Sequence, residues 1–342
     1  MEEKGSIGIP KALMFYRYFP FWKTFFEALG WKVICSDEVG KRGKLVYFED
    51  SCLPMKLLVT HSVLLKDRVE HLFIPRLVSL DRSYIMCPKF RGAPDIIRLA
   101  TEGSVPIIDE TIDLRTREHS LRSSFLRIGQ RLGATVKESK EAFQRAEAFS
   151  LRFKREWGDR INALPLKQLF QMEVSAPLTS RGEMEAGSFR VAFVGHPYNL
   201  FDSDINKDIL SFARGLGMKI LTPDLLSEEE IDRQISGLSK EIYWSSGREI
   251  VGSLFHFLSG GVDGVVFLTS FKCGIDALLQ EFVKRRLKTR GEGTFTPFLI
   301  LSLDEHSGRE GLTTRLEAFR DVMEERKGKG KISDNQISIT KH

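Results

Sequence analysis

Three of the four cysteines in the sequence stand where an apolar run ends and a helical pattern begins. Cys52 lies in "EDSCLPMK", two residues before a proline, Cys87 precedes a proline in "IMCPKF", and Cys273 precedes a glycine in "SFKCGID". A thiolate at a helix N-terminus is stabilised by the helix dipole and by free N–H groups, which lower its pKa. The same N–H groups can donate to cluster sulfides. These positions favour metal, iron–sulfur or redox chemistry.

Spacing alone leaves other interpretations of these thiols open. Free cysteine is among the most buried residue types and often only fills space. Cys35, inside the strand-like "WKVICS", is predicted to be such a core residue. A structural zinc site of Cys52, Cys87, Cys273 and one histidine is a weaker option, because zinc ligands usually come in close pairs such as C-x-x-C, which this chain does not have. Ligands so far apart in sequence would form a site assembled from both halves of the chain.

Short apolar runs alternate with helical patterns in two blocks, which is typical of parallel sheets with crossover helices. In the first block the strand candidates are residues 6–10, 31–36, 44–48, 71–80 and 105–109, and the helix candidates are 12–30, 54–67 and 94–100. In the second block the strand candidates are 189–195, 218–223, 264–270 and 296–303, and the helix candidates are 204–217, a region around 226–258, 275–286 and 308–325. Ligands of open α/β sheets lie outside the carboxyl ends of the strands, so we expect the three cysteines to meet in one cleft.

This pattern predicts an α/β protein with two doubly wound, Rossmann-like parallel-sheet domains and a helical connecting region. The predicted parts are an N-terminal α/β domain (1–115), a helical connection and linker (116–185), a C-terminal α/β domain (186–325) and a basic, mobile tail (326–342). Pro20 is expected to kink or split the first helix. Pro54 suits the first turn of the second, which we expect to be amphipathic.

His196, Glu305 and His306 are the weak candidates for catalysis. His196, in "GHPYNL", ends a strand at the same predicted sheet edge as the cysteines, so it is a fourth ligand, a proton donor, a substrate contact or only a turn residue. Glu305 and His306, with Asp304 in "LDEHSGREG", suit metal or acid–base chemistry, although Ser307 before a glycine also fits a helix cap. The remaining polar residues are assigned cleft-facing or packing roles (Tyr16, Arg17), loop and cap roles (Asn199, Asp202) and structural roles (His61, His71).

Composition excludes several classes of function. The chain has 342 residues, 42% of them hydrophobic, and 51 basic against 46 acidic residues give a formal charge of +5. Much of that surplus falls in the C-terminal segment, and no basic stripe elsewhere indicates nucleic acid. No apolar run reaches the roughly 18 residues of a membrane helix, and "MEEKGS" is unlike a signal peptide. We therefore expect a cytoplasmic protein with no membrane or nucleic-acid partner.

Several ordered motifs resemble those of the acyl-CoA dehydratase activase-related proteins, which are relatives of 2-hydroxyacyl-CoA dehydratase and benzoyl-CoA reductase subunits and of double-cubane cluster proteins. In the N-terminal part these are "IGIPKALMFYRYFPFWKTFFEALGWKV", "SCLPMK", "FIPRLVS" and "CPKFRGAPD". In the C-terminal part they are "GHPYNLFD", "IYWSSGREI", "FKCGID" and "LDEHSGREGLTTRLEAF". The resemblance spans about 6–325.

The resemblance implies that Cys52, Cys87 and Cys273 ligate a 4Fe–4S cluster, which is either single or part of a double-cubane cluster. It implies electron transfer from a separate ATP-dependent activator of the actin/Hsp70-like ATPase type to an acyl-CoA or another hard-to-reduce substrate, in an anaerobic setting. The chain would then be the iron–sulfur component of a reductase or dehydratase, as a homo- or heterodimer with a related subunit. The alternative is a non-catalytic cluster carrier or regulatory subunit.

Overall fold

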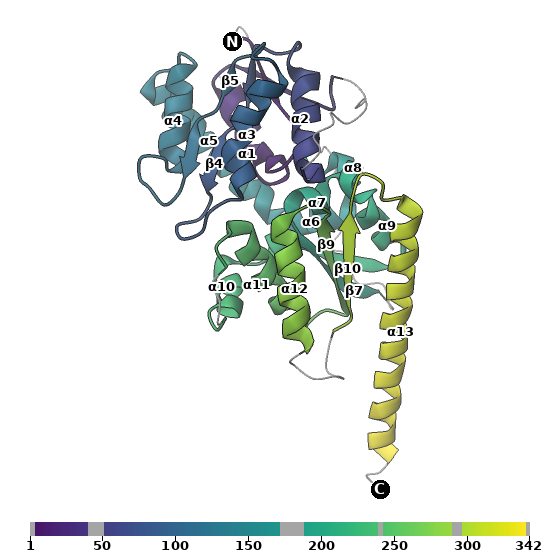
Figure 1. Ribbon diagram of the computed structural model, residues 1–342. Coiled ribbons are helices and arrows are strands. Elements are labelled where there is room, and N and C mark those ends of the chain that lie inside the picture. The colour runs from purple at the N-terminus through teal and green to yellow at the C-terminus, as the bar shows by residue number, and fades with distance from the viewer. Residues whose placement is uncertain (1–3, 40–50, 172–187, 239–241, 289–295, 340–342) are drawn as a thin grey trace.

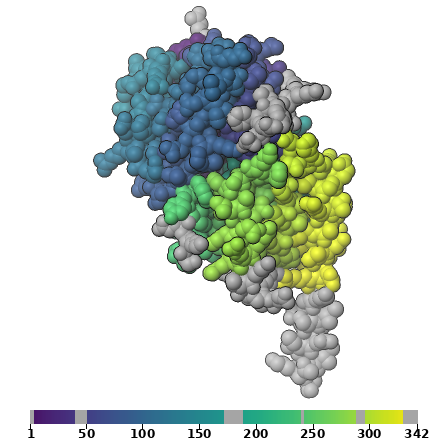
Figure 2. All heavy atoms as spheres, viewed as in Figure 1, coloured from purple at the N-terminus to yellow at the C-terminus, as the bar shows by residue number. Residues whose placement is uncertain are grey.

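Parallel strands and helices form two α/β units in the computed structural model, which describes residues 4–39, 51–171, 188–238, 242–288 and 296–339. The N-terminal unit and the helices that follow it lie against the C-terminal unit (Figure 1). Figure 2 shows the same arrangement on the surface, with the N-terminal half above the C-terminal half. The predicted α/β class with parallel sheets is confirmed.

The sheet of the N-terminal unit has four parallel strands in the order β2–β1–β3–β5 (Lys32–Cys35, Ser6–Ile9, His71–Phe73, Ile107–Ile108). The predicted single strand over 71–80 is wrong, because the chain changes sheet at Pro75. β4 (Arg76–Ser79) pairs instead with β6 (Thr111–Asp113) in a separate two-stranded sheet. Proline has no N–H for a strand ladder, so regular pairing is interrupted there. The strand candidate 44–48 lies outside the described residues.

The sheet of the C-terminal unit has the order β10–β9–β7–β8 (Phe298–Leu303, Gly264–Ser270, Phe189–Gly195, Met218–Leu221), again all parallel. Every residue of β9 is buried, as expected of a central parallel strand covered on both faces. Gly195 at the end of β7 lies opposite Leu268, and a Cβ atom there would come within 2.5 Å of the Leu268 carbonyl oxygen. Glycine is therefore required where these two strands approach the site.

Helices cover the sheets and connect the units. The N-terminal unit has α1 (Phe15–Ala28), α2 (Leu53–Leu65) and α3 (Pro88–Ala100). The connection has α4 (Leu121–Arg131), α5 (Val136–Arg155), α6 (Trp157–Ala163) and the 3-10 turn η1 (Leu166–Gln168). The C-terminal unit has α7 (Pro197–Phe201), α8 (Ser203–Asn206), α9 (Ile209–Gly215), the 3-10 turn η2 (Pro223–Leu225), α10 (Glu228–Ile235), α11 (Ser245–Leu258), α12 (Gly274–Lys288) and α13 (Arg309–Ile339).

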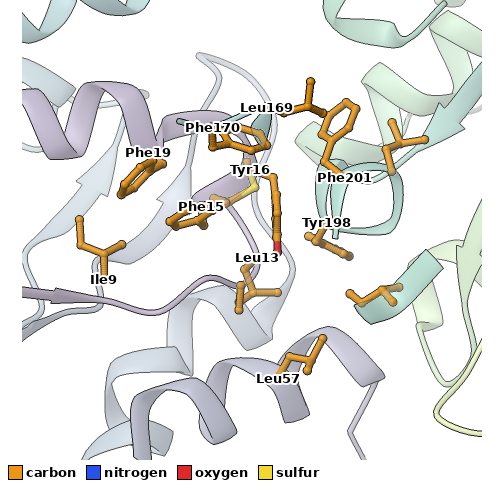
Figure 3. Close-up of a cluster of buried hydrophobic side chains, with 14 of the residues drawn as sticks. Ile9, Leu13, Phe15, Tyr16, Phe19, Leu57, Leu169, Phe170, Tyr198 and Phe201 are labelled. Carbon is orange, nitrogen blue, oxygen red and sulfur yellow. The ribbon is translucent and has the colours of Figure 1, made fainter. Parts of the chain in front are cut away.

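An aromatic cluster on α1 joins the two units. Phe15 and Tyr16 contact Phe170, which follows the helical connection, with ring centroids 5.8 and 5.5 Å apart. Phe170 in turn contacts Phe201 of α7 at 6.4 Å. Figure 3 shows these side chains gathered between α1 and α7. The buried hydrophobic core is continuous through this cluster. The cluster therefore holds α1 of the N-terminal unit against α7 of the C-terminal unit.

Three helices differ from the sequence-based expectations. Pro20 does not split α1, which is continuous from Phe15 to Ala28. α2 is not amphipathic, because nearly all of its residues are buried, even Lys56. The predicted helix 204–217 is divided into α8 and α9, since Lys207 and Asp208 between them have φ of 55° and 59°.

The C-terminal helix is longer than expected. α13 continues to Ile339, through most of the segment whose composition predicts a mobile tail. Among the helices in the described ranges, none combines the length and apolar character that crossing a bilayer requires.

Candidate functional site

Each of the three cysteines lies at the start of a helix. Cys52 is the N-cap of α2 and Cys87 the N-cap of α3, both with extended backbone and with proline in the first turn of the helix that follows. Cys273 immediately precedes Gly274, the first residue of α12, after β9 has ended at Ser270. Neither α2 nor α3 has an acidic residue in its first turn. The Cys52 and Cys87 thiols therefore lie beside helix N-termini whose positive dipole ends carry no opposing acid, whereas the first turn of α12 after Cys273 contains Asp276.

The three thiols interact with one another. Burial raises the pKa of Cys52, and the charges of Cys273 and Cys87 raise it further. Burial also raises the pKa of Cys87, again with a contribution from Cys273. Lys89 opposes these effects, since its Nζ lies 3.8 Å from Cys52 Sγ and lowers the pKa of that thiol. The helix starts that carry Cys52 and Cys87 thus meet around Lys89, and Cys273 of the C-terminal unit lies close enough to raise the pKa of both thiols.

Cys35 lies elsewhere, as expected of a core residue. It is 4% exposed and packs in the hydrophobic core. It is the last residue of β2 rather than an interior one, however, and its thiol groups with the more exposed carboxylates of Asp37 and Glu38. Burial and then Glu38 raise the pKa of Cys35.

His196 belongs to the cysteine site. It caps α7 directly after Gly195, and its Nε2 lies 2.9 Å from Asp276 Oδ1. Donor atoms of His196, Cys273 and Asp276 all lie within 4.8 Å of one another. Burial alone would lower the pKa of His196, but Asp276, together with Cys273, outweighs it and raises the pKa to about 10. The raised pKa favours the imidazolium form of His196, which lies beside the Asp276 side chain and the Cys273 thiol.

Buried polar groups hold Asp276 in place. Its Oδ2 accepts a 2.7 Å hydrogen bond from the Ser270 N–H and a 3.4 Å bond from Asn199 Nδ2. Ser270 Oγ donates to Asn199 Oδ1 at 2.6 Å. Asn199 therefore has a structural role beyond the loop position predicted for it. Its side chain links α7 to the end of β9 and to Asp276.

Three residues of the site were not singled out from the sequence. Asp276 lies three residues after Cys273, and Lys89 two residues after Cys87, so proximity to the cysteines was the available signal. Tyr198 stacks on His196, with ring centroids 4.8 Å apart and 13° between the planes. Burial is the largest effect that raises the pKa of Tyr198, and the charge of Cys273 raises it further.

The structure does not bring Glu305 and His306 into this cluster. Glu305 pairs with Lys56 at 2.6 Å, joining the loop after β10 to α2. His306 is exposed, and its N–H donates to Asp304 Oδ1 at 2.8 Å. Ser307 Oγ also donates to Asp304, at 3.0 Å, so this motif forms the local turn before α13.

A cavity of about 290 Å³ adjoins the site between the two units. Tyr16 and Arg17 line it from α1, and His196 lines it from the C-terminal unit. Arg17 donates to Glu249 Oε2 of α11 at 2.5 Å, so it faces the cleft, which is one of the two roles that its sequence position allowed.

Fold and site together define a parallel α/β protein whose two units both contribute thiols at helix starts to one polar centre. The chain belongs to the family described as the CoA enzyme activase uncharacterised domain, whose model matches residues 6–226. That match includes Cys52, Cys87 and His196 and ends before Cys273. The expected relation to CoA enzyme activases is confirmed at this level. No match was found among curated proteins.

Proposed function

We propose that Cys52, Cys87 and Cys273 hold a 4Fe–4S cluster and that the chain is an iron–sulfur redox protein of a CoA enzyme system. The observation that carries the proposal is the convergence of three thiols at helix starts from both units. Three thiols that are far apart in sequence but meet at helix starts suit a shared ligand better than core packing.

The donor set fits such a cluster. The three cysteines are free of disulfides, and two of them are only half buried. Thiolate ligands and cluster sulfides accept hydrogen bonds from backbone N–H groups, which helix N-termini offer. Lys89 and the His196 imidazolium place positive charge beside Cys52 and Cys273, where a cluster would add negative charge.

When bound, such a cluster supplies electrons one at a time at low potential. The residues of the chain set its surroundings. Lys89 offsets thiolate charge at Cys52, and Asp276 orients His196 beside Cys273. Tyr198 covers one face of the imidazole, and both side chains are buried.

We further propose that the electrons come from a separate ATP-dependent activator of the actin/Hsp70-like ATPase type. The acceptor would be an acyl-CoA or a similarly hard-to-reduce compound, handled by this chain alone or with a related subunit. Support comes from the family description, which names a CoA enzyme activase. If the chain together with an activator converts no thioester, we propose instead that the chain is a non-catalytic cluster carrier or regulatory subunit.

Anaerobic reconstitution tests the cofactor. We expect about four irons and four sulfides per chain, with an electron paramagnetic resonance signal after reduction. A preparation that takes up zinc alone, or no metal, after reconstitution with iron and sulfide would refute the cluster. Stoichiometric zinc would instead identify the structural-site alternative.

A further inference from the structure

His196, Cys273 and Asp276 offer three different metal ligands within a small volume. Their donor atoms, a ring nitrogen, a sulfur and a carboxylate oxygen, all lie within 4.8 Å of one another. Bonds from such atoms to zinc are about 2.0–2.3 Å long, so two donors on one ion lie at most about 4.6 Å apart. A small adjustment of the side chains therefore brings all three donors within bonding distance of a single ion.

Two atoms of this group are buried without a hydrogen-bond partner. His196 Nε2 and Asp276 Oδ1 lie 2.9 Å apart, yet neither has a partner of hydrogen-bond geometry within the described residues. Both side chains are almost fully buried, with 3% and 0% of their surface exposed. Buried polar atoms nearly always have a partner, and an ion bound by both atoms would provide one.

The carboxylate already has the outer hydrogen bonds that are typical of a metal ligand. Asp276 Oδ2 accepts hydrogen bonds from the Ser270 N–H and from Asn199 Nδ2, which leaves Oδ1 beside His196. Ligands that are held in this way keep their orientation and bind metal more tightly. Cys273 is only half-buried, so an ion can reach the group from solvent.

Charge favours a divalent cation at this position. An ionised Asp276 has no exposed surface, and a deprotonated Cys273 adds a second negative charge beside it. An imidazolium offsets one of these charges, whereas a divalent ion offsets both and leaves His196 as a neutral ligand. Thiolate and imidazole ligands select zinc and similar transition metals over magnesium and calcium, which prefer oxygen.

We infer that His196, Cys273 and Asp276 bind one divalent transition-metal ion of the zinc class in the chain that carries no cluster. Three protein ligands leave the fourth position of a tetrahedral ion for water or another small ligand. The inference does not rest on the proposed function, because Cys52 and Cys87 take no part in binding this ion. The ion and the proposed cluster both use Cys273, so one excludes the other.

A second group of donors provides a matched control. Cys35, Asp37 and Glu38 also place a sulfur and two carboxylate oxygens within 4.8 Å of one another. These carboxylates have partners, because Lys11 pairs with Asp37 at 2.5 Å and Glu38 Oε1 accepts the Cys35 N–H at 3.3 Å. Both carboxylates are also exposed, so we expect no tight metal site there.

Titration of the reduced, cluster-free full chain with Co²⁺ tests the inference, because cobalt bound to a thiolate has a charge-transfer absorption band. We expect one ion per chain with this band, and we expect Zn²⁺ to displace it. Cys273→Ala should remove the band. Asp276→Asn should weaken binding by at least about tenfold, since the loss of an outer partner alone costs that factor. Cys35→Ala should bind Co²⁺ as the wild type does.

Variants of the other two cysteines separate this site from a zinc site of three cysteines. Cys52→Ala and Cys87→Ala should keep the Co²⁺ band and affinity, although both should lose iron after reconstitution. If Asp276→Asn folds poorly, His196→Gln removes the ring nitrogen and gives the same test.

Four results would overturn the inference. They are no bound ion, a bound ion without the charge-transfer band, loss of the band in Cys52→Ala or Cys87→Ala, and wild-type affinity in Asp276→Asn. Cobalt titration and iron–sulfide reconstitution both start from chelator-treated protein, so that an ion at Cys273 does not block the cluster. The two proposals then fail separately, because failure to take up iron leaves the cobalt titration unaffected.

Discussion

Cys87 and His196 each precede a proline, and this proline determines the backbone conformation of both residues and their position at the start of a helix. A residue before proline is kept out of the helical region and in extended backbone, while proline itself suits the first turn of a helix. Both residues accordingly have ψ near that of an extended chain, 139° and 146°, and both cap a helix. Their place at a helix start was therefore predictable from the dipeptide alone. The partner of His196 was not, because Asp276 reaches it only through the pairing of β7 with β9 within the C-terminal unit.

Alanine substitution of each cysteine tests the ligand assignment. Cys52→Ala, Cys87→Ala and Cys273→Ala should each lose most of the iron after anaerobic reconstitution, because a cluster held by two thiolates is labile. Cys35→Ala is the matched control and should keep its iron, although it loses packing in the core. Iron-to-protein ratios for the four variants provide the measurement. Iron loss confined to the Cys35 variant would mean that the wrong thiols had been assigned.

Asp202 provides a test of buried charge away from the thiols. Burial, together with Asp204, raises its pKa from 3.8 to about 6. The folded state then binds the proton more tightly than the unfolded state between these two values. Stability from this group is therefore greatest below about pH 4 and is lost as pH rises through about 6, by up to about 3 kcal/mol.

Asp202→Asn should reduce this pH dependence without loss of the cap on α8. Its side-chain oxygen can still accept the Asp204 N–H, now 2.8 Å from Oδ1. Urea unfolding at pH 4 to 8 measures the effect, and we expect a flatter profile for the variant. Parallel profiles for wild type and variant would show that Asp202 is ionised in the folded protein throughout this range.

At the scale of elements, the close approach of β7 and β9 sets the position of His196. Gly195→Ala would place a Cβ 2.5 Å from the Leu268 carbonyl oxygen, so the strands must separate. We expect a loss of about 1–3 kcal/mol in the free energy of unfolding, as for other overpacked sites. Gly215→Ala in α9 meets no atom within 4 Å and should be neutral or slightly stabilising. Equal losses in the two variants would contradict this account.

Element prediction succeeded where hydrophobic runs were long and failed where local backbone geometry decided. β7 and β9 match their apolar runs because buried parallel strands need apolar residues on both faces. The chain passes from one sheet to another at Pro75 because β4 pairs with β6. The sequence around Pro75 contains no information on the position of β6. The break between α8 and α9 depends on two left-handed residues, Lys207 and Asp208, neither of which is a glycine.

At the scale of the whole molecule, the site spans the junction of the two units, so a bound cluster should stabilise both together. Reconstitution should raise the unfolding temperature, since a ligand held at about a thousand times its dissociation constant adds about 4 kcal/mol. Cys273→Ala removes the contribution of the C-terminal unit and should abolish the rise. Differential scanning calorimetry under anaerobic conditions measures it. An equal rise in wild type and Cys273→Ala would show that the cluster does not join the units.

The position of Cys273 also has a consequence for how the protein is made. Cys52 and Cys87 leave the ribosome long before Cys273, because 186 residues separate Cys87 from Cys273. A centre that requires all three thiols cannot form on the nascent N-terminal half. Its assembly must wait until β9 and the start of α12 have been synthesised and docked. If the three thiols hold the proposed cluster, its insertion is a late event in the biogenesis of the chain, and until then two reduced thiols must be protected from oxidation and stray metal ions.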